Sequence, residues 1–191
     1  LTGVKTALIM GFASGSEGAP VESLLSIFSP SIITMSLHFS LNGQAVQTPA
    51  DPNTSLLTVL TQDFAVNGTK YGCGKAQCGS CTVLINGEPV RSCVTPASSA
   101  AGRSVTTLAG LSRDGRPNRL QQAFIDEQAA QCGYCTSGMI LTAKALLESN
   151  PSPSRDEIRE AIAGNICRCT GYNQIVDSIE VAAAELRGDA K

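Results

Sequence analysis

Residues 72–93 read GCGKAQCGSCTVLINGEPVRSC, and this stretch decides the fold of the first half of the chain. Its pattern is C-x4-C-x2-C-x11-C, which places four thiols on one long loop and on the segments that follow it. The cysteines are Cys73, Cys78, Cys81 and Cys93. Four thiolates are the ligand set of a diiron, two-sulfide core. The stretch therefore predicts a [2Fe–2S] site.

Glycines alternate with these cysteines and are predicted to let the loop wrap a cluster. A residue without Cβ tolerates positive φ and allows backbone N–H groups to approach sulfur, where their hydrogen bonds tune the reduction potential. The predicted cluster-loop glycines are Gly72, Gly74 and Gly79. The spacing of the first three cysteines is that of plant-type two-iron ferredoxins.

A second group of cysteines follows the pattern C-x2-C-x31-C-x-C, within QCGYCTSGM and GNICRCTGY. One pair precedes a predicted helix and the other lies between two later helices, so both pairs can meet at one end of a helical bundle. The cysteines are Cys132, Cys135, Cys167 and Cys169. Two groups of four account for all 8 cysteines of the chain.

Disulfide bonds and structural zinc are the two alternatives to iron–sulfur ligation for these thiols. Disulfides are disfavoured because Cys167 and Cys169 are too close in sequence to bridge easily and no convincing secretory signal is present. Structural zinc stays open, since four thiolates satisfy tetrahedral zinc. Zinc sites favour paired C-x2-C knuckles, however, whereas the first group has a single long wrapping loop.

The amino-acid composition argues against several functional classes. The chain has 191 residues, which fit one large domain or two small ones. Lys plus Arg number 14 against 16 Asp plus Glu, so the basic footprint of a nucleic-acid-binding protein is missing. Charged residues are 16% of the chain, below the usual value of roughly 25%, which suggests a subunit whose surface is partly covered by other proteins. No apolar run is long enough for a transmembrane segment.

Hydrophobic periodicity predicts a small α+β domain in the first half. Alternating apolar residues flank Asn42-Gly43, and Asn86-Gly87 repeats this hairpin signal after an apolar, β-branched run. Asn53, Thr54 or Ser55 is available to cap a helix. The expected elements are a hairpin over 36–47, a helix over 55–64 and strands over 82–85 and 105–108.

The second half is predicted to be a helical bundle. A breaker-rich stretch over 110–117 suits a domain boundary, and Ser154 with Glu157 forms a capping-box pattern. The expected helices cover 120–131, 136–149, 154–163 and 174–186. The resulting division is a first domain over 36–110 and a bundle domain over 111–191.

Residues 1–35 are predicted to be a flexible N-terminal extension. They contain the Gly- and Ser-rich stretch GFASGSEGAP, and a single Lys5 with an early Gly11 fits a signal peptide poorly. Met35 directly precedes the first strand pattern. The segment is therefore either a leader or upstream sequence read from an early start, and the sequence does not choose between them.

Both motif blocks resemble the iron–sulfur small subunit of the molybdenum hydroxylases, the xanthine oxidase and aldehyde oxidoreductase family. The resemblance covers roughly residues 36–186, and the motif residues are most similar to those of the isoquinoline 1-oxidoreductase and aldehyde dehydrogenase types. It implies a β-grasp, plant-type ferredoxin-like domain followed by a four-helix-bundle domain, each holding one [2Fe–2S] cluster. Tyr134, Ser137 and Ser80 depart from residues common in the family, and none is a predicted ligand.

The same resemblance implies an electron-transfer role with no complete active site and no catalytic residue in this chain. A large partner subunit would hold molybdopterin cytosine dinucleotide, and a flavin (FAD) subunit or a cytochrome c would accept the electrons. Gln131 is expected to hydrogen-bond the pterin and Cys169 to lie close to it. On sequence alone, Gln131 could equally be a solvated amide at a helix end.

Several points stay open at this stage. The alternatives are a zinc-stabilised interaction module without redox activity and a free-standing two-cluster ferredoxin. Cytoplasmic localisation is expected because the cofactors are assembled there, with periplasmic export on a partner's signal as the alternative. Substrate, acceptor, cluster potentials and stoichiometry are not encoded in recognisable residues of this chain.

Overall fold

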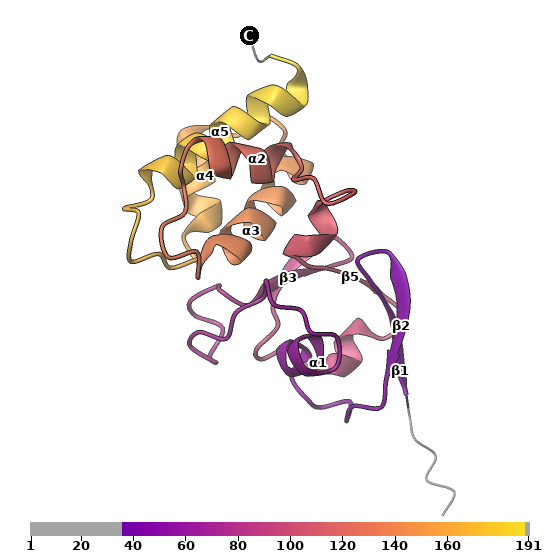
Figure 1. Cartoon of the computed structure of the whole chain (residues 1–191). Helices are drawn as coiled ribbons and strands as arrows, with labels where there is room; N and C mark the ends of the chain where they lie inside the picture. Colours follow the sequence, from indigo (N-terminus) through magenta and orange to yellow (C-terminus); the bar gives the residue numbers. More distant parts are fainter. Residues whose placement is uncertain (1–35, 190–191) are drawn as a thin grey trace, which may run out of the picture. The chain divides into compact units, whose positions relative to one another are not determined.

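A mixed five-stranded sheet forms the first half of the described chain. The computed structural model describes residues 36–189. The strand order is β2-β1-β5-β3-β4, with β1 and β5 parallel and the other neighbours antiparallel (Figure 1). The strands are β1 Leu37–Leu41, β2 Gln44–Thr48, β3 Thr82–Ile85, β4 Glu88–Arg91 and β5 Ser104–Thr106.

Both predicted hairpin turns are confirmed. Asn42 and Gly43 have φ of 52° and 84°, and Asn86 and Gly87 have φ of 52° and 89°. Positive φ at both central residues defines a type I′ turn, whose twist matches that of the paired strands. The first turn joins β1 to β2, and the second joins β3 to β4.

Helix α1 (Leu56–Gln62) covers one face of the sheet. Ser55 caps it by accepting a hydrogen bond from the Thr58 backbone N–H, which confirms one of the three expected caps. Every residue of β3 is buried, so this strand has neighbours on both faces. The core beneath α1 consists of Phe39, Leu41, Leu56, Leu60, Val83, Ile85, Ala100 and Val105.

Four α-helices form the second half: α2 Arg119–Asp126, α3 Thr136–Ser149, α4 Arg155–Ile162 and α5 Asn173–Arg187 (Figure 1). The capping box predicted for Ser154 and Glu157 is present at the start of α4. A second capping box, formed by Asn118 and Gln121, begins α2. The helices share a large core that also contains Leu84 of β3, so the sheet and the bundle pack against each other.

Three element ends predicted from the sequence are wrong, and one of them is the end of α1, at Gln62 and not at residue 64. The hydrophobic pattern predicts that the first bundle helix continues to Gln131, but α2 ends at Asp126 because Gln128 takes a positive φ of 52° and the chain turns back. The strand predicted over 105–108 ends at Thr106, since Leu108 already begins a short 3-10 helix, η3 (Leu108–Leu111). A further 3-10 helix, η2, covers Ala97–Ala100.

The predicted α+β fold class, a sheet domain followed by a helical domain, is confirmed. The domain boundary near residue 110 stays a prediction, and the extension predicted over 1–35 lies outside the described residues. None of the helices within residues 36–189 combines the length and the hydrophobicity that a membrane span requires.

The bundle core should be sensitive to truncation. Ile158 is fully buried in α4, so Ile158→Ala should lower the free energy of unfolding by about 2–5 kcal/mol through lost burial and a residual cavity. Denaturant titration of the folded protein measures this change. Ile125, 60% exposed on α2, provides the matched control, and Ile125→Ala should change stability by no more than about 0.5 kcal/mol. Equal effects of the two changes would contradict the assigned core.

Candidate metal centres

The first cysteine group lies on the long loop between α1 and β3 and on the segment after β4. Cys81 is buried directly before β3, which anchors this end of the loop in the sheet. Ser92 Oγ donates a hydrogen bond of 2.6 Å to the Cys81 carbonyl, so the segment carrying Cys93 is fixed beside Cys81. The hairpin of β3 and β4 therefore brings together two cysteines that are separated by a long stretch of sequence.

Backbone N–H groups converge on the Cys73 sulfur. Those of Lys75 and Gln77 each lie 3.3 Å from Sγ, and that of Cys78 lies 3.4 Å away. Hydrogen bonds from Lys75, Cys78 and Gln77 lower the pKa of the Cys73 thiol to about 6, because each stabilises the thiolate. The loop thus presents an anionic sulfur at neutral pH.

The cluster-loop glycines occupy positions where a side chain would not fit. A Cβ on Gly72 would lie 2.6 Å from Cys78 Sγ. Gly74 and Gly79 have positive φ of 66° and 75°, a conformation that glycine adopts without strain. A Cβ on Gly79 would also lie 2.7 Å from the side chain of Asn165, so this glycine serves the contact with the bundle as well.

The second cysteine group lies where two loops of the bundle meet. Cys132 and Cys169 have their sulfurs 3.5 Å apart and both are exposed. Cys135, which precedes α3, is buried, and its thiol interacts with that of the half-buried Cys167. The expected meeting of the two loops at one end of the bundle is confirmed, and the group has an exposed outer pair and an inner pair.

Burial favours the neutral form of one thiol in each group. Desolvation raises the pKa of the Cys135 thiol to about 12 and that of the Cys81 thiol to about 11. A bound metal ion deprotonates a coordinating thiol outright. Ligation at these two positions therefore needs a strongly Lewis-acidic partner such as iron or zinc.

The thiols of each group lie close enough to affect one another. The Cys132 and Cys169 sulfurs are 3.5 Å apart, and neighbouring cysteines of the same group shift the pKa values of Cys73, Cys81 and Cys135. In a [2Fe–2S] cluster each iron takes two protein ligands, so two sulfur pairs fit one diiron core. Structural zinc instead needs four ligands around one point. Four cysteines per group supply the ligand set of either centre, and the single long loop of the first group favours the diiron core.

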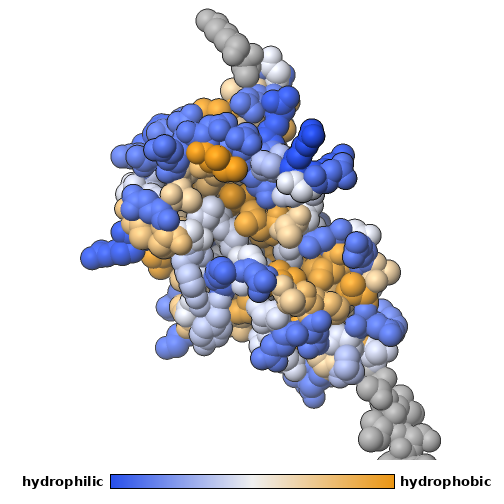
Figure 2. All heavy atoms as spheres, in the orientation of Figure 1, coloured by the Kyte–Doolittle hydropathy of each residue, from blue (hydrophilic) through white to orange (hydrophobic). Residues whose placement is uncertain are grey.

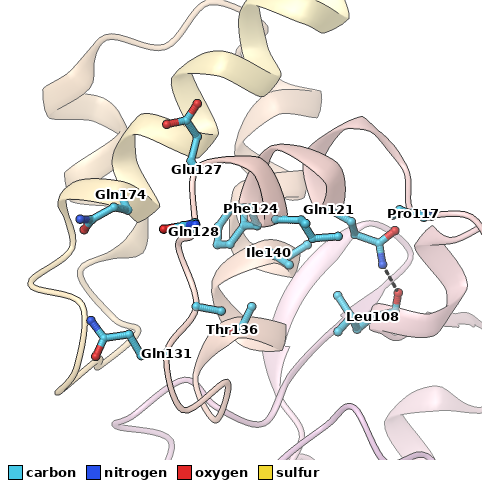
Figure 3. Close-up of a pocket in the computed structure, with 12 residues that line it drawn as sticks. Leu108, Pro117, Gln121, Phe124, Glu127, Gln128, Gln131, Thr136, Ile140 and Gln174 are labelled. Carbon is cyan, nitrogen blue, oxygen red and sulfur yellow. Dashed lines mark hydrogen bonds between the residues drawn. The ribbon is translucent and has the colours of Figure 1, made fainter.

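Gln131 lies beside the second cysteine group at the rim of a pocket of about 770 Å³. Figure 3 shows Gln131 near Thr136 and Gln174, away from the apolar floor formed by Phe124 and Ile140. Because α2 ends earlier than expected, Gln131 is in the loop leading to Cys132 and is not at a helix end. Gln131 is exposed, as the alternative interpretation of a solvated amide requires, although it lies in a loop and not at a helix end.

Sequence reasoning missed the residues that join the two cysteine groups. The backbone N–H of Ile166 donates to the carbonyl oxygen of Cys78 over 2.9 Å. The Tyr134 hydroxyl donates to the Tyr71 carbonyl, which gives a second bond between the two loops. Ile166 and Tyr134 lie within the quoted motifs, but contacts between residues so distant in sequence leave no periodic signal.

Comparison with known proteins agrees with this geometry. The family described as "2Fe-2S iron-sulfur cluster binding domain" matches residues 39–109, and the "[2Fe-2S] binding domain" family matches residues 107–180. A nicotinate dehydrogenase subunit of Pseudomonas putida is 51% identical over 151 residues, covering 79% of this chain and 96% of that protein. The alpha subunit of isoquinoline 1-oxidoreductase of Brevundimonas diminuta is 49% identical over 150 residues, covering 78% and 98%.

A solved structure of a related enzyme also resembles this chain. Quinoline 2-oxidoreductase from Pseudomonas putida 86 has a TM-score of 0.76 and 45% identity, covering 82% of this chain and 98% of that chain. Two [2Fe–2S]-binding domains in this order define an electron-transfer subunit. The chain belongs to the family of [2Fe–2S] small subunits of the molybdenum hydroxylases.

The lack of room for a side chain at Gly72 provides a test of the first cysteine group as a cluster site. Gly72→Ala should remove about half of the iron bound per chain, because the new Cβ would displace Cys78 Sγ in one of two diiron sites. Iron analysis of the purified protein measures this loss. Gly68→Ala is the matched control, since its Cβ would meet Leu108 at an ordinary 3.5 Å and iron binding should be unchanged. Full iron content in Gly72→Ala would argue against the assigned loop.

Proposed function

We propose that this chain relays single electrons from a molybdopterin centre in a large partner subunit, through two [2Fe–2S] clusters, to an external acceptor. The first cluster would be held by Cys73, Cys78, Cys81 and Cys93, and the second by Cys132, Cys135, Cys167 and Cys169. Each cluster, when bound, accepts and releases one electron at a time, which suits the stepwise removal of the two electrons of substrate oxidation.

The observation that carries the proposal is the hydrogen bond from the Ile166 N–H to the Cys78 carbonyl, at 2.9 Å. Ile166 is covalently next to Cys167, an inner thiol of the second group, and Cys78 belongs to the first. One hydrogen bond and a few covalent bonds therefore connect a ligand of one cluster with a ligand of the other. Two independent zinc sites would not require this connection, whereas an electron relay does.

The difference in exposure between the outer and inner thiols of the second group indicates the direction of electron flow in this relay. The outer pair of the second group, Cys132 and Cys169, is exposed, while Cys135 is buried and Cys167 half-buried. We place the molybdopterin-binding partner against the outer pair, with Gln131 hydrogen-bonding the pterin and Cys169 near it. Figure 2 shows apolar surface among the hydrophilic regions of one face, as expected of a chain that works within a larger complex.

The finer assignments rest on the relatives. Their names include nicotinate dehydrogenase, isoquinoline 1-oxidoreductase and aldehyde oxidoreductase, so the proposed substrates are N-heterocycles or aldehydes. The substrate pocket would belong to the large subunit, which we propose holds molybdopterin cytosine dinucleotide. A flavin subunit or a cytochrome c would take the electrons, and the assembled enzyme would reside in the cytoplasm or be exported with its partner.

Cys167→Ser in the assembled complex tests the relay. The change should abolish turnover with the physiological acceptor, because the inner pair of the second group and its link to Cys78 are both affected. Turnover and the paramagnetic spectrum of the reduced complex measure the effect, and one of two cluster signals should be lost. Ser149→Ala, at the exposed end of α3, is the control and should retain both. Full turnover by Cys167→Ser would refute the relay, and a wild-type chain that purifies without any molybdenum subunit would favour a free-standing ferredoxin.

A further inference from the structure

Asn165 is a fully buried polar residue at the joint between the sheet domain and the bundle. Its Nδ2 donates to the carbonyl of Gly79, in the first cysteine loop, over 3.3 Å. Its Oδ1 accepts from Thr142 Oγ1 of α3 over 3.1 Å. One side chain in the loop of the second cysteine group thus holds both the bundle and the loop of the first group.

Arg91, the last residue of β4, reaches across the same joint. Its Nη2 donates to the Gly164 carbonyl over 2.9 Å and to Asn165 Oδ1 over 3.2 Å, and its Nη1 donates to Thr82 Oγ1. The guanidinium fork therefore ties the sheet directly to the bundle loop that carries Cys167. A lysine has no planar fork and cannot reproduce all of these bonds.

Backbone packing at the joint leaves no room for adjustment. A Cβ on Gly138, in the first turn of α3, would lie 2.1 Å from the Gly79 carbonyl oxygen. On the opposite side, a Cβ on Gly79 would meet the Asn165 side chain at 2.7 Å. Glycines on both sides allow the first cysteine loop and the bundle to touch at backbone distance.

Asn165 also orders the segment that carries the inter-loop hydrogen bond. It directly precedes Ile166, whose N–H contacts the Cys78 carbonyl. The Tyr172 hydroxyl accepts from the Cys167 N–H over 2.8 Å and lies 3.3 Å from the Asn165 carbonyl. The position of Asn165 thus sets the positions of Ile166 and Cys167 relative to the first loop.

We propose that Asn165 is a positioning residue that, together with Arg91, fixes the separation between the two cysteine groups and maintains the contact between Ile166 and Cys78. The inference rests on the proposed relay, and it names the residues that fix the distance over which an electron passes from one cluster to the other. A buried amide with only a structural role would affect stability alone, whereas a positioning role also controls the magnetic interaction and electron exchange between the clusters.

The experiment compares Asn165→Ala and Arg91→Lys with wild type in the complex containing the molybdopterin subunit. The reduced complexes are examined for the splitting that two nearby paramagnetic clusters impose on each other's spectra, and for the rate of electron exchange between the clusters. Asn118→Ala removes a helix cap from the same bundle without touching the joint, and controls for lost stability.

Both joint variants should show weakened splitting and a several-fold slower exchange rate, because the magnetic interaction and electron tunnelling both fall off as the distance between the clusters grows. Asn118→Ala should retain both properties. Wild-type splitting and exchange in an iron-replete Asn165→Ala would overturn the inference, and if that variant does not load iron, the same result in Arg91→Lys overturns it. Failure of the proposed relay is distinguishable, because the wild-type complex would then show no pair of interacting signals.

Discussion

In the proposed relay, the step between the two cysteine groups depends on one short contact between two loops. The Ile166 N–H and the Cys78 carbonyl meet at 2.9 Å, and each is bonded within a few atoms to a thiol of a different cysteine group. Neither group forms without its own domain, since the β3–β4 hairpin assembles the first and the bundle loops assemble the second. The fold can therefore be understood as a scaffold that brings two groups of four thiols close to each other.

The pKa values of the cysteine thiols differ because their surroundings differ. Cys73 receives several backbone N–H groups, which lower its pKa, whereas burial raises the pKa of Cys81 and Cys135. The donors at Cys73 are the kind of hydrogen bonds that shift a cluster's reduction potential. The two domains also differ in access, because the outer pair of the second group, Cys132 and Cys169, is exposed. A partner that delivers electrons can approach this pair without rearranging the bundle.

Local sequence signals predicted most of the architecture. Asn-Gly turns and the Ser154–Glu157 capping box each act over a few residues, so the sequence alone is enough to identify them. The sequence left three candidate caps for α1, and only the structure selects Ser55. The end of α2 is different, because only the positive φ of Gln128 stops the helix. Asn165 and Gly138 were missed for another reason: their importance comes from contact with Gly79, which is distant in sequence and is brought near only by the packing of the two domains.

The central claim is that each cysteine group holds a [2Fe–2S] cluster, and joint analysis of metal and acid-labile sulfide in the native protein tests it most directly. Two diiron clusters per chain predict iron and sulfide in equal amounts, with red-brown absorption and negligible zinc. Colourless protein that carries zinc and no sulfide would contradict the account, because the two groups of thiols would then hold zinc ions and not diiron clusters.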